Sequence, residues 1–269
     1  MSRFLEQMAR ASAARVPTDR TGIRQAAKDA PPAPPLDLGR FGVIAEVKWA
    51  SPSEGALTAS PADQKAATAR KAALYAQAGA AAISVLTEPS RFHGHMGLLL
   101  AAAAASTVPV MRKDFLVDPA QLFEARAAGA GGALLIARML PGGLLGEMLD
   151  AASEAGLWVL LEAFDAADLR RIAALPRRAD VLAGLNCRDL QTLQIDPDRF
   201  TALAPLRPAG RPTIAESGMA TPADAASAAR LGYRGALVGS ALMKAASPAA
   251  LLAEMLDAGR KACSSRSVA

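Results

Sequence analysis

The sequence predicts a single (β/α)8 barrel, of the TIM-barrel fold class, with an extension before it. Short apolar runs rich in β-branched residues alternate along the chain with longer Ala/Leu-rich segments of helical period. Eight such runs can be counted, and a helical segment follows each of them. The connections are short enough to stay inside one compact unit. An open doubly wound sheet is the second arrangement that the same pattern allows.

The composition of the 269-residue chain is that of a globular protein with a large aliphatic core, since 52% of the residues are hydrophobic. The formal net charge is +5, but the basic residues are spread along the chain with acidic residues between them. Only 4% of the residues are aromatic. This balance suits an anionic small molecule and argues against a nucleic-acid surface. Two cysteines, Cys187 and Cys263, are too few for a disulfide framework. No long uninterrupted apolar run is present, so we expect a cytoplasmic protein without membrane contact.

The first 40 residues differ in pattern from the rest of the chain. Residues 2–15 predict an amphipathic helix with Phe4, Leu5 and Met8 on one side, and the prolines within 31–35 predict an extended connector. We therefore expect three parts: an N-terminal extension (1–40), the barrel (41–262) and a disordered tail (263–269).

The barrel elements follow in order. Strands are expected at 42–47, 81–86, 108–112, 132–136, 157–162, 181–186, 212–216 and 235–239. Helices are expected near 61–78, 95–105, 118–128, 141–155, 165–175, 196–204, 221–231 and 248–262. Capping residues support several of the helix starts, in particular Asp118-Pro119, Asp165 and Thr221-Pro222 with Asp224.

Ionisable and polar side chains stand at the predicted C-terminal ends of the strands, where a (β/α)8 barrel carries its chemistry. Glu46 and Lys48 end the first strand, and strand alternation places them on the same face. The corresponding residues of later strands are Arg112, Lys113 and Asp114, then Glu162, then Asn186 and Arg188, and then Glu216 and Ser217. The number of strand ends that agree indicates an active site.

Lys113 and Glu162 are the candidates for proton transfer. We expect Arg112 and Lys48 to lower the pKa of Lys113, with Asp114 opposing them, so that the amine can act as an acid or a nucleophile. Glu162 follows a run of five apolar residues, and a carboxyl group in such a position suits general acid or base catalysis.

A phosphate group is the expected anionic handle of the ligand. Gly218 and Gly239, next to Ser217 and Ser240, follow the last two strands, where barrels of this kind bind phosphate. No dinucleotide or P-loop fingerprint is present, and His93 and His95 stand without further metal-ligating neighbours. Cys187 lacks a nearby histidine, which favours a packing role over a nucleophilic one.

With these residues placed, the chain resembles the indole-3-glycerol-phosphate synthase family of tryptophan biosynthesis, a family of (β/α)8 enzymes. The resemblance covers essentially all of residues 42–245 in the right order. The matching stretches are Ile44–Lys48 with Ala50–Ser53, Ile83–Glu88 with Phe92 and Gly94, Arg112–Phe115, Glu124–Ala130, Gly184–Asn186 with Arg188–Leu190, Ala215–Gly218, and Leu237–Ser240 with Leu242-Met243.

The resemblance implies decarboxylating and dehydrating ring closure of 1-(2-carboxyphenylamino)-1-deoxyribulose 5-phosphate, with no metal or organic cofactor. It implies that Lys113 is the general acid and Glu162 an acid/base, and that Lys48, Glu46, Asn186 and Ser217 assist catalysis. Arg188, Glu216 and Phe92 would bind substrate. The implied phosphate-binding residues are Ser51, Gly218, Gly239 and Ser240. A monomer or weak homo-oligomer is expected.

Three positions depart from the family pattern: Trp49 and Phe164 replace polar residues and are expected near the barrel mouth, and Cys187 stands where Asn is usual. A specialised enzyme for a substituted anthranilate derivative is therefore a competing hypothesis. The sequence also leaves open another phosphosugar barrel enzyme, a Schiff-base aldolase using Lys113, and a barrel that only binds a phosphorylated ligand.

Overall fold

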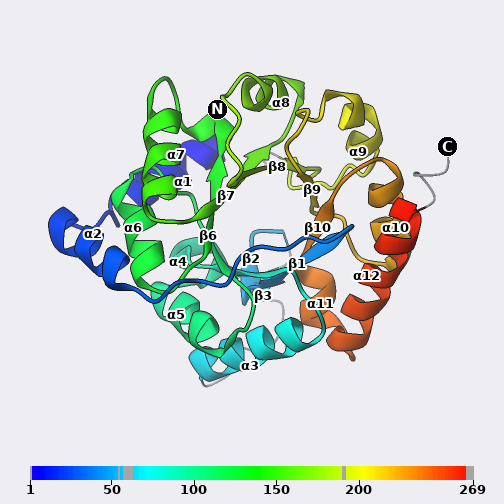
Figure 1. Ribbon diagram of the computed structural model, residues 1–269, viewed down its shortest axis with the longest axis horizontal. Helices are drawn as coiled ribbons and strands as arrows, with labels where there is room; N and C mark the ends of the chain where they lie inside the picture. Colours follow the sequence, from blue (N-terminus) through cyan, green and yellow to red (C-terminus); the bar gives the residue numbers. More distant parts are fainter. Residues whose placement is uncertain (1, 54, 57–62, 190–191, 265–269) are drawn as a thin grey trace.

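In the residues that the computed structural model describes (2–53, 55–56, 63–189 and 192–264), eight parallel strands close into a barrel inside a ring of helices (Figure 1). The strands are β1 (Gly42–Val47), β4 (Ala82–Leu86), β5 (Val110–Lys113), β6 (Gly132–Ile136), β7 (Trp158–Ala163), β8 (Val181–Asn186), β9 (Thr213–Glu216) and β10 (Gly235–Val238). Each pairs with its neighbours in the chain, and β1 pairs with β10 to close the ring. The predicted (β/α)8 barrel is confirmed.

The helices around the barrel lie close to their predicted positions. They are α3 (Gln64–Gln77), α5 (Met96–Ala105), α6 (Ala120–Ala127), α7 (Leu144–Glu154), α8 (Ala166–Ala173), α9 (Asp198–Leu203), α10 (Pro222–Arg230) and α12 (Pro248–Ser264). The predicted caps are present: Asp165 accepts from the Asp168 N–H, and Thr221 and Asp224 form a reciprocal capping box. Residues 61–62 of an expected helix and 265–269 of the expected tail lie outside the described residues.

Several short elements have no counterpart in the predicted pattern. They are helix α2 (Arg20–Asp29), the two-stranded sheet of β2 (Ala50–Ser51) and β3 (Gly55–Ala56), helices α4 (Pro89–Phe92) and α11 (Ser240–Lys244), and the 3-10 turns η1 (Ala137–Met139) and η2 (Ala204–Leu206). Most are too short to show an apolar period, and α2 is largely polar. The β2–β3 sheet, α4 and α11 all follow barrel strands and border the mouth.

The N-terminal helix α1 (Arg3–Ala13) docks at the end of the barrel where the strands finish. Leu5 and Met8 are buried in the same apolar cluster as Phe115 and the barrel interior. Beyond the helix, the guanidinium of Arg15 donates two hydrogen bonds of 2.8 Å to the carboxylate of Asp114, just after β5. The predicted amphipathic helix therefore buries its apolar side against the barrel mouth.

The Pro-rich connector covers the opposite end of the barrel. It leaves α2 and crosses to β1, as the blue stretch in Figure 1 shows. The Arg126 side chain donates to the carbonyl oxygens of Ala30 and Pro31. Leu36 and Leu38 pack against the interior cluster that contains Ile44. One continuous N-terminal segment therefore covers both ends of the barrel.

The Arg15–Asp114 pair should contribute measurably to stability, because the Asp114 side chain is fully buried. Replacement Arg15→Met leaves this carboxylate with Thr87, Arg112 and the Phe115 backbone N–H. We expect the free energy of unfolding to fall by about 1–3 kcal/mol in chemical denaturation. Arg20→Met is the matched control, because Arg20 makes the same two-pronged pair with Asp118 at the surface. Equal losses for both variants would contradict the assignment.

Candidate active site

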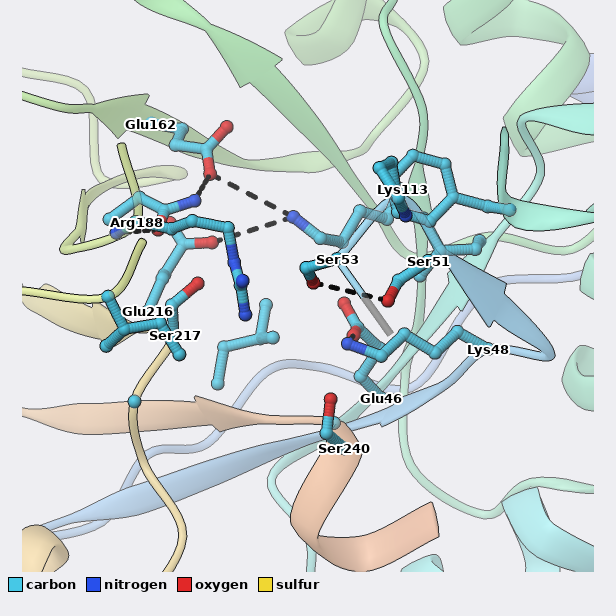
Figure 2. Close-up of a pocket in the computed structure, with 18 of the residues that line it drawn as sticks. Glu46, Lys48, Ser51, Ser53, Lys113, Glu162, Arg188, Glu216, Ser217 and Ser240 are labelled. Carbon is cyan, nitrogen blue, oxygen red and sulfur yellow. Dashed lines mark hydrogen bonds and ion pairs between the residues drawn. The ribbon is translucent and has the colours of Figure 1, made fainter. Parts of the chain in front are cut away.

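A cavity of about 650 Å³ opens at the C-terminal ends of the strands (Figure 2). Every residue to which the resemblance assigns a catalytic, substrate-binding or phosphate-binding role lines it. The residues are Glu46, Lys48, Ser51, Phe92, Lys113, Glu162, Asn186, Arg188, Glu216, Ser217, Gly218, Gly239 and Ser240. The barrel therefore brings together side chains from distant parts of the chain, as parallel strands that end in the same ring must do.

Glu46 and Lys48 form an ion pair on the floor of the cavity. Lys48 Nζ lies 2.9 Å from Glu46 Oε1, and the Glu46 side chain is almost fully buried. Burial alone would raise the pKa of Glu46, but the charges of Lys48 and Lys113 hold it below its ordinary value. The placement of both side chains on one face of β1 is as predicted.

Lys113 lies among carboxylates. Its Nζ is 3.7 Å from Glu216 Oε2 and 4.0 Å from Glu162 Oε1, contacts that Figure 2 marks with dashed lines. Burial tends to lower the pKa of this amine, but Glu162, Glu216 and Glu46 outweigh it and raise the pKa above its ordinary value. The prediction of a lowered pKa for Lys113 was wrong, because acidic rather than cationic groups surround the amine.

Arg112, the expected cationic neighbour of Lys113, faces away from it. Because side chains alternate along β5, the Arg112 guanidinium is buried on the outer side of the barrel. There it donates to Glu124 at 2.7 Å and to the Gln121 carbonyl at 2.8 Å, and lies 3.4 Å from Asp114. These contacts fix the end of the strand that carries Lys113.

Glu162 and Asn186 are hydrogen-bonded across β7 and β8. Asn186 Nδ2 donates to Glu162 Oε1 at 2.6 Å, and Asn186 Oδ1 accepts from the Arg188 N–H at 2.9 Å. The Arg188 guanidinium in turn donates to the Leu193 carbonyl. The amide of Asn186 therefore fixes the orientation of a carboxylate that lies within ion-pair distance of Lys113.

Glu216 is buried without hydrogen-bond partners for its carboxyl oxygens in the described part of the structure. Burial and the charge of Glu162 raise its pKa well above the ordinary value, and Lys113 only partly opposes them. Gly184 on the neighbouring strand makes the space for this side chain, since a Cβ there would lie 2.0 Å from Glu216 Oε1. A buried group that is only partly compensated in this way is typical of functional sites.

The side of the cavity near β9 and β10 carries hydroxyl groups and glycines. Ser217 and Gly218 both adopt positive φ angles, of 66° and 68°. This conformation is costly for serine and is typical of ligand-binding turns. A Cβ at Gly239 would lie 2.3 Å from Glu46 Oε1, so any side chain there would displace the Glu46 carboxylate. Ser51 and Ser53 place their hydroxyl groups 3.4 Å apart (Figure 2).

Another part of the cavity wall is aromatic. The ring of Phe115 contacts Phe92 and Phe4, with centroids 6.2 Å and 5.8 Å apart. Glu88 holds the segment of Phe92 by accepting from the backbone N–H groups at the start of α4. Phe4 and Phe115 were not predicted from the sequence to belong to the site. The apolar side predicted for the first helix was a signal for Phe4.

The three positions that depart from the family pattern have different surroundings. Trp49 was expected near the mouth, but it is buried between the barrel and α3, where its Nε1 donates to Thr68 Oγ1 at 3.2 Å. Trp49 is therefore not among the residues that line the cavity. Cys187 is buried in the same cluster, and burial raises the pKa of its thiol to about 11, in line with a packing role. Phe164 lines the cavity.

Two other kinds of feature are absent from the described residues. No three His, Cys, Asp or Glu side chains there lie close enough together to hold a metal ion. None of the described helices is long and apolar enough to cross a membrane.

The fold and the cavity define a barrel enzyme of the acid–base type, with its charged groups on the strand ends. A family model described as "Indole-3-glycerol phosphate synthase" matches residues 34–255. A protein of that name from Mycobacterium avium is 44% identical over 243 residues, 88% of this chain and 86% of its own length. Another from Laribacter hongkongensis is 45% identical, covering 81% and 80%. The chain belongs to the indole-3-glycerol phosphate synthase family.

More distant solved structures share only the fold. A 3-hexulose-6-phosphate synthase from Salmonella typhimurium superimposes with a TM-score of 0.62 at 16% identity, covering 82% of this chain and all of its own. A thiamine phosphate pyrophosphorylase from Pyrococcus furiosus gives 0.58 at 13% identity, covering 84% and 98%. At such identities the likeness concerns the barrel itself.

The raised pKa of Glu216 should appear in the pH dependence of stability. A carboxyl group whose pKa is raised in the folded state destabilises the fold as pH rises above the unfolded value of about 4.3. We expect the free energy of unfolding of Glu216→Gln, relative to wild type, to grow as pH rises from about 5 to 8 in denaturant titrations. Glu254→Gln, at an exposed position of α12, controls for the lost charge and should stay parallel to wild type. If the difference in unfolding free energy between Glu216→Gln and wild type became smaller as pH rises, the assignment would be contradicted.

Proposed function

We propose that this protein catalyses the ring closure of 1-(2-carboxyphenylamino)-1-deoxyribulose 5-phosphate to indole-3-glycerol phosphate, with loss of carbon dioxide and water. The observation that carries the proposal is the position of the Lys113 ammonium group beside Glu162 and Glu216 in the cavity. The membership of the chain in this family supports it. This arrangement supplies a proton donor with carboxylate groups beside it, which a condensation followed by a dehydration requires.

In the first step the aromatic carbon that bears the carboxylate attacks the ketone carbon, and a carbon–carbon bond forms. Lys113 donates a proton to the carbonyl oxygen, which becomes a hydroxyl group. The raised pKa keeps the amine protonated and ready for this role at neutral pH. Departure of carbon dioxide then returns its bonding electrons to the ring and restores aromaticity.

In the second step the hydroxyl group takes a proton and leaves as water, while the neighbouring carbon loses a proton to form the indole double bond. We assign these transfers to Glu162, which Asn186 orients at 2.6 Å. Lys48 and Glu46 are positioned to polarise the reacting region, and Glu216, Ser217 and Arg188 to orient the substrate. The proposal needs no metal or organic cofactor.

The two kinds of cavity wall suit the two ends of this substrate. The hydroxyl groups and glycines of Ser51, Gly218, Gly239 and Ser240 suit the phosphate. Phe92, with Phe4 and Phe115, suits the carboxyphenyl ring. We propose that the protein works in the cytoplasm as a monomer or weak homo-oligomer, on a small phosphorylated molecule and not on nucleic acid or membrane. Residues 41–262 would be the catalytic barrel and 1–40 its extension.

The decisive variant is Lys113→Ala. Loss of a positioned general acid should reduce kcat by about 10²–10⁴-fold, as followed by the appearance of indole fluorescence from the carboxyphenylamino substrate. Lys261→Ala is the control, because Lys261 lies at the surface of α12 and pairs with Asp257. It should retain wild-type turnover.

The same assay separates the competing functions. A substrate adduct trapped by borohydride would indicate a Schiff-base aldolase. A wild-type protein that binds the substrate without releasing carbon dioxide would indicate a binding barrel, and an isomerised product that keeps its carboxylate would indicate another phosphosugar enzyme. Each of these results would overturn the proposed reaction.

A further inference from the structure

Phe164 stands between two hollows of the molecule. It directly follows β7, two residues after Glu162, and its side chain is only 4% exposed. On one side it lines the active-site cavity. On the other it lines a polar hollow of about 680 Å³ beside α8 and α9, together with Arg138, Asp165 and Arg199. Of the described residues, Phe164 and Arg188 are the two that line both.

The Phe164 ring is held in place from the outer side. The Arg138 guanidinium lies 5.0 Å from the ring centroid, an arrangement that favours a cation–π contact. Asp168 holds this guanidinium at 2.8 Å through Nε, and Asp165 holds its other end. Asp168 also accepts from the Phe164 backbone N–H at 2.9 Å. The same carboxylate therefore fixes the backbone of Phe164 and the cation against its ring.

The inner side of Phe164 belongs to the apolar part of the cavity. It packs in the same cluster as Phe115, Ile136 and Met139, and Phe4 and Phe92 pack against that cluster. If the carboxyphenyl ring occupies this part of the cavity, a group added to the ring has little room on the Phe164 side. The polar hollow that Phe164 also lines lies on its other side.

From these contacts we infer that Phe164 is a specificity-determining residue, which limits the size of substituents on the aromatic ring of the substrate. The inference rests on the proposed function, because it assigns the aryl end of that substrate to this wall. In this role Phe164 favours the plain carboxyphenylamino substrate over ring-substituted ones. A rigid wall discriminates by steric exclusion, and one methyl group in such a position changes kcat/KM by about 10–200-fold.

The test compares the plain substrate with its 4-methyl and 5-methyl ring derivatives. Wild type should discriminate against at least one derivative by about 10-fold or more in kcat/KM. Phe164→Ala removes a side chain that lines both hollows. It should raise the ratio of kcat/KM for that derivative to kcat/KM for the plain substrate by about 10-fold, chiefly through a lower relative KM. Phe164→Leu, which keeps an apolar side chain and disturbs packing less, should raise the ratio by a smaller factor.

Two further variants separate this role from a general loss of packing. Arg138→Gln removes the cation beside the Phe164 ring but leaves the ring itself. It should relax discrimination between the plain and methylated substrates less than Phe164→Ala does. Phe200→Leu alters a buried aromatic that contacts Tyr233 outside the cavity, and should leave the ratio unchanged. Equal shifts in all four variants would overturn the inference.

Binding makes the test independent of turnover. The ratio of Kd values for the plain and methylated compounds, measured by calorimetry, should move in the same direction as kcat/KM. If wild type turns over neither compound, the proposed reaction fails and the Kd ratio still decides the role of Phe164. Wild-type discrimination below about 3-fold, or ratios that stay constant in folded Phe164→Leu and Phe164→Ala, would overturn it.

Discussion

The site depends on one buried ammonium group that three carboxylates surround. Lys113 comes from β5, whereas Glu46, Glu162 and Glu216 come from β1, β7 and β9, so the cluster exists only when the barrel is closed. Isolated charges are costly to bury, and each of these groups offsets part of the cost of the others. Lys48 pairs with Glu46, whereas Lys113 lies between Glu162 and Glu216 and only partly compensates Glu216. The closed barrel thus holds an incompletely compensated carboxyl group in its cavity.

The barrel could be predicted from the sequence because each of its elements has a local signal. A buried parallel strand is a continuous apolar run, and each surrounding helix has its own period and cap. The site residues could be found for a related reason, since the strand ends of a barrel converge whatever the loops do. The direction of the Lys113 pKa could not be found in this way. Its neighbour in sequence, Arg112, faces outward, and the decisive carboxylates are distant in the chain.

The difference between local signals and contacts of distant residues also explains why some cavity-lining residues were not predicted. Phe4 belongs to α1, and nothing in its local sequence states that the helix lies on the barrel mouth. Arg15 and Asp114, which fix that position, are 99 residues apart. Trp49 directly follows Lys48, but alternation turns its side chain away from the cavity and toward α3. Contacts between remote segments, rather than local patterns, decide such placements.

The N-terminal segment that covers both ends of the barrel has a consequence for the order of events during synthesis. This segment is synthesised before the surfaces that it binds: Asp114 is 99 residues downstream of Arg15, and Glu154 is 130 residues downstream of Arg24. Leu5 and Met8 can therefore reach their buried positions only after the barrel residues of the same cluster, such as Phe115 and Met139, have been synthesised.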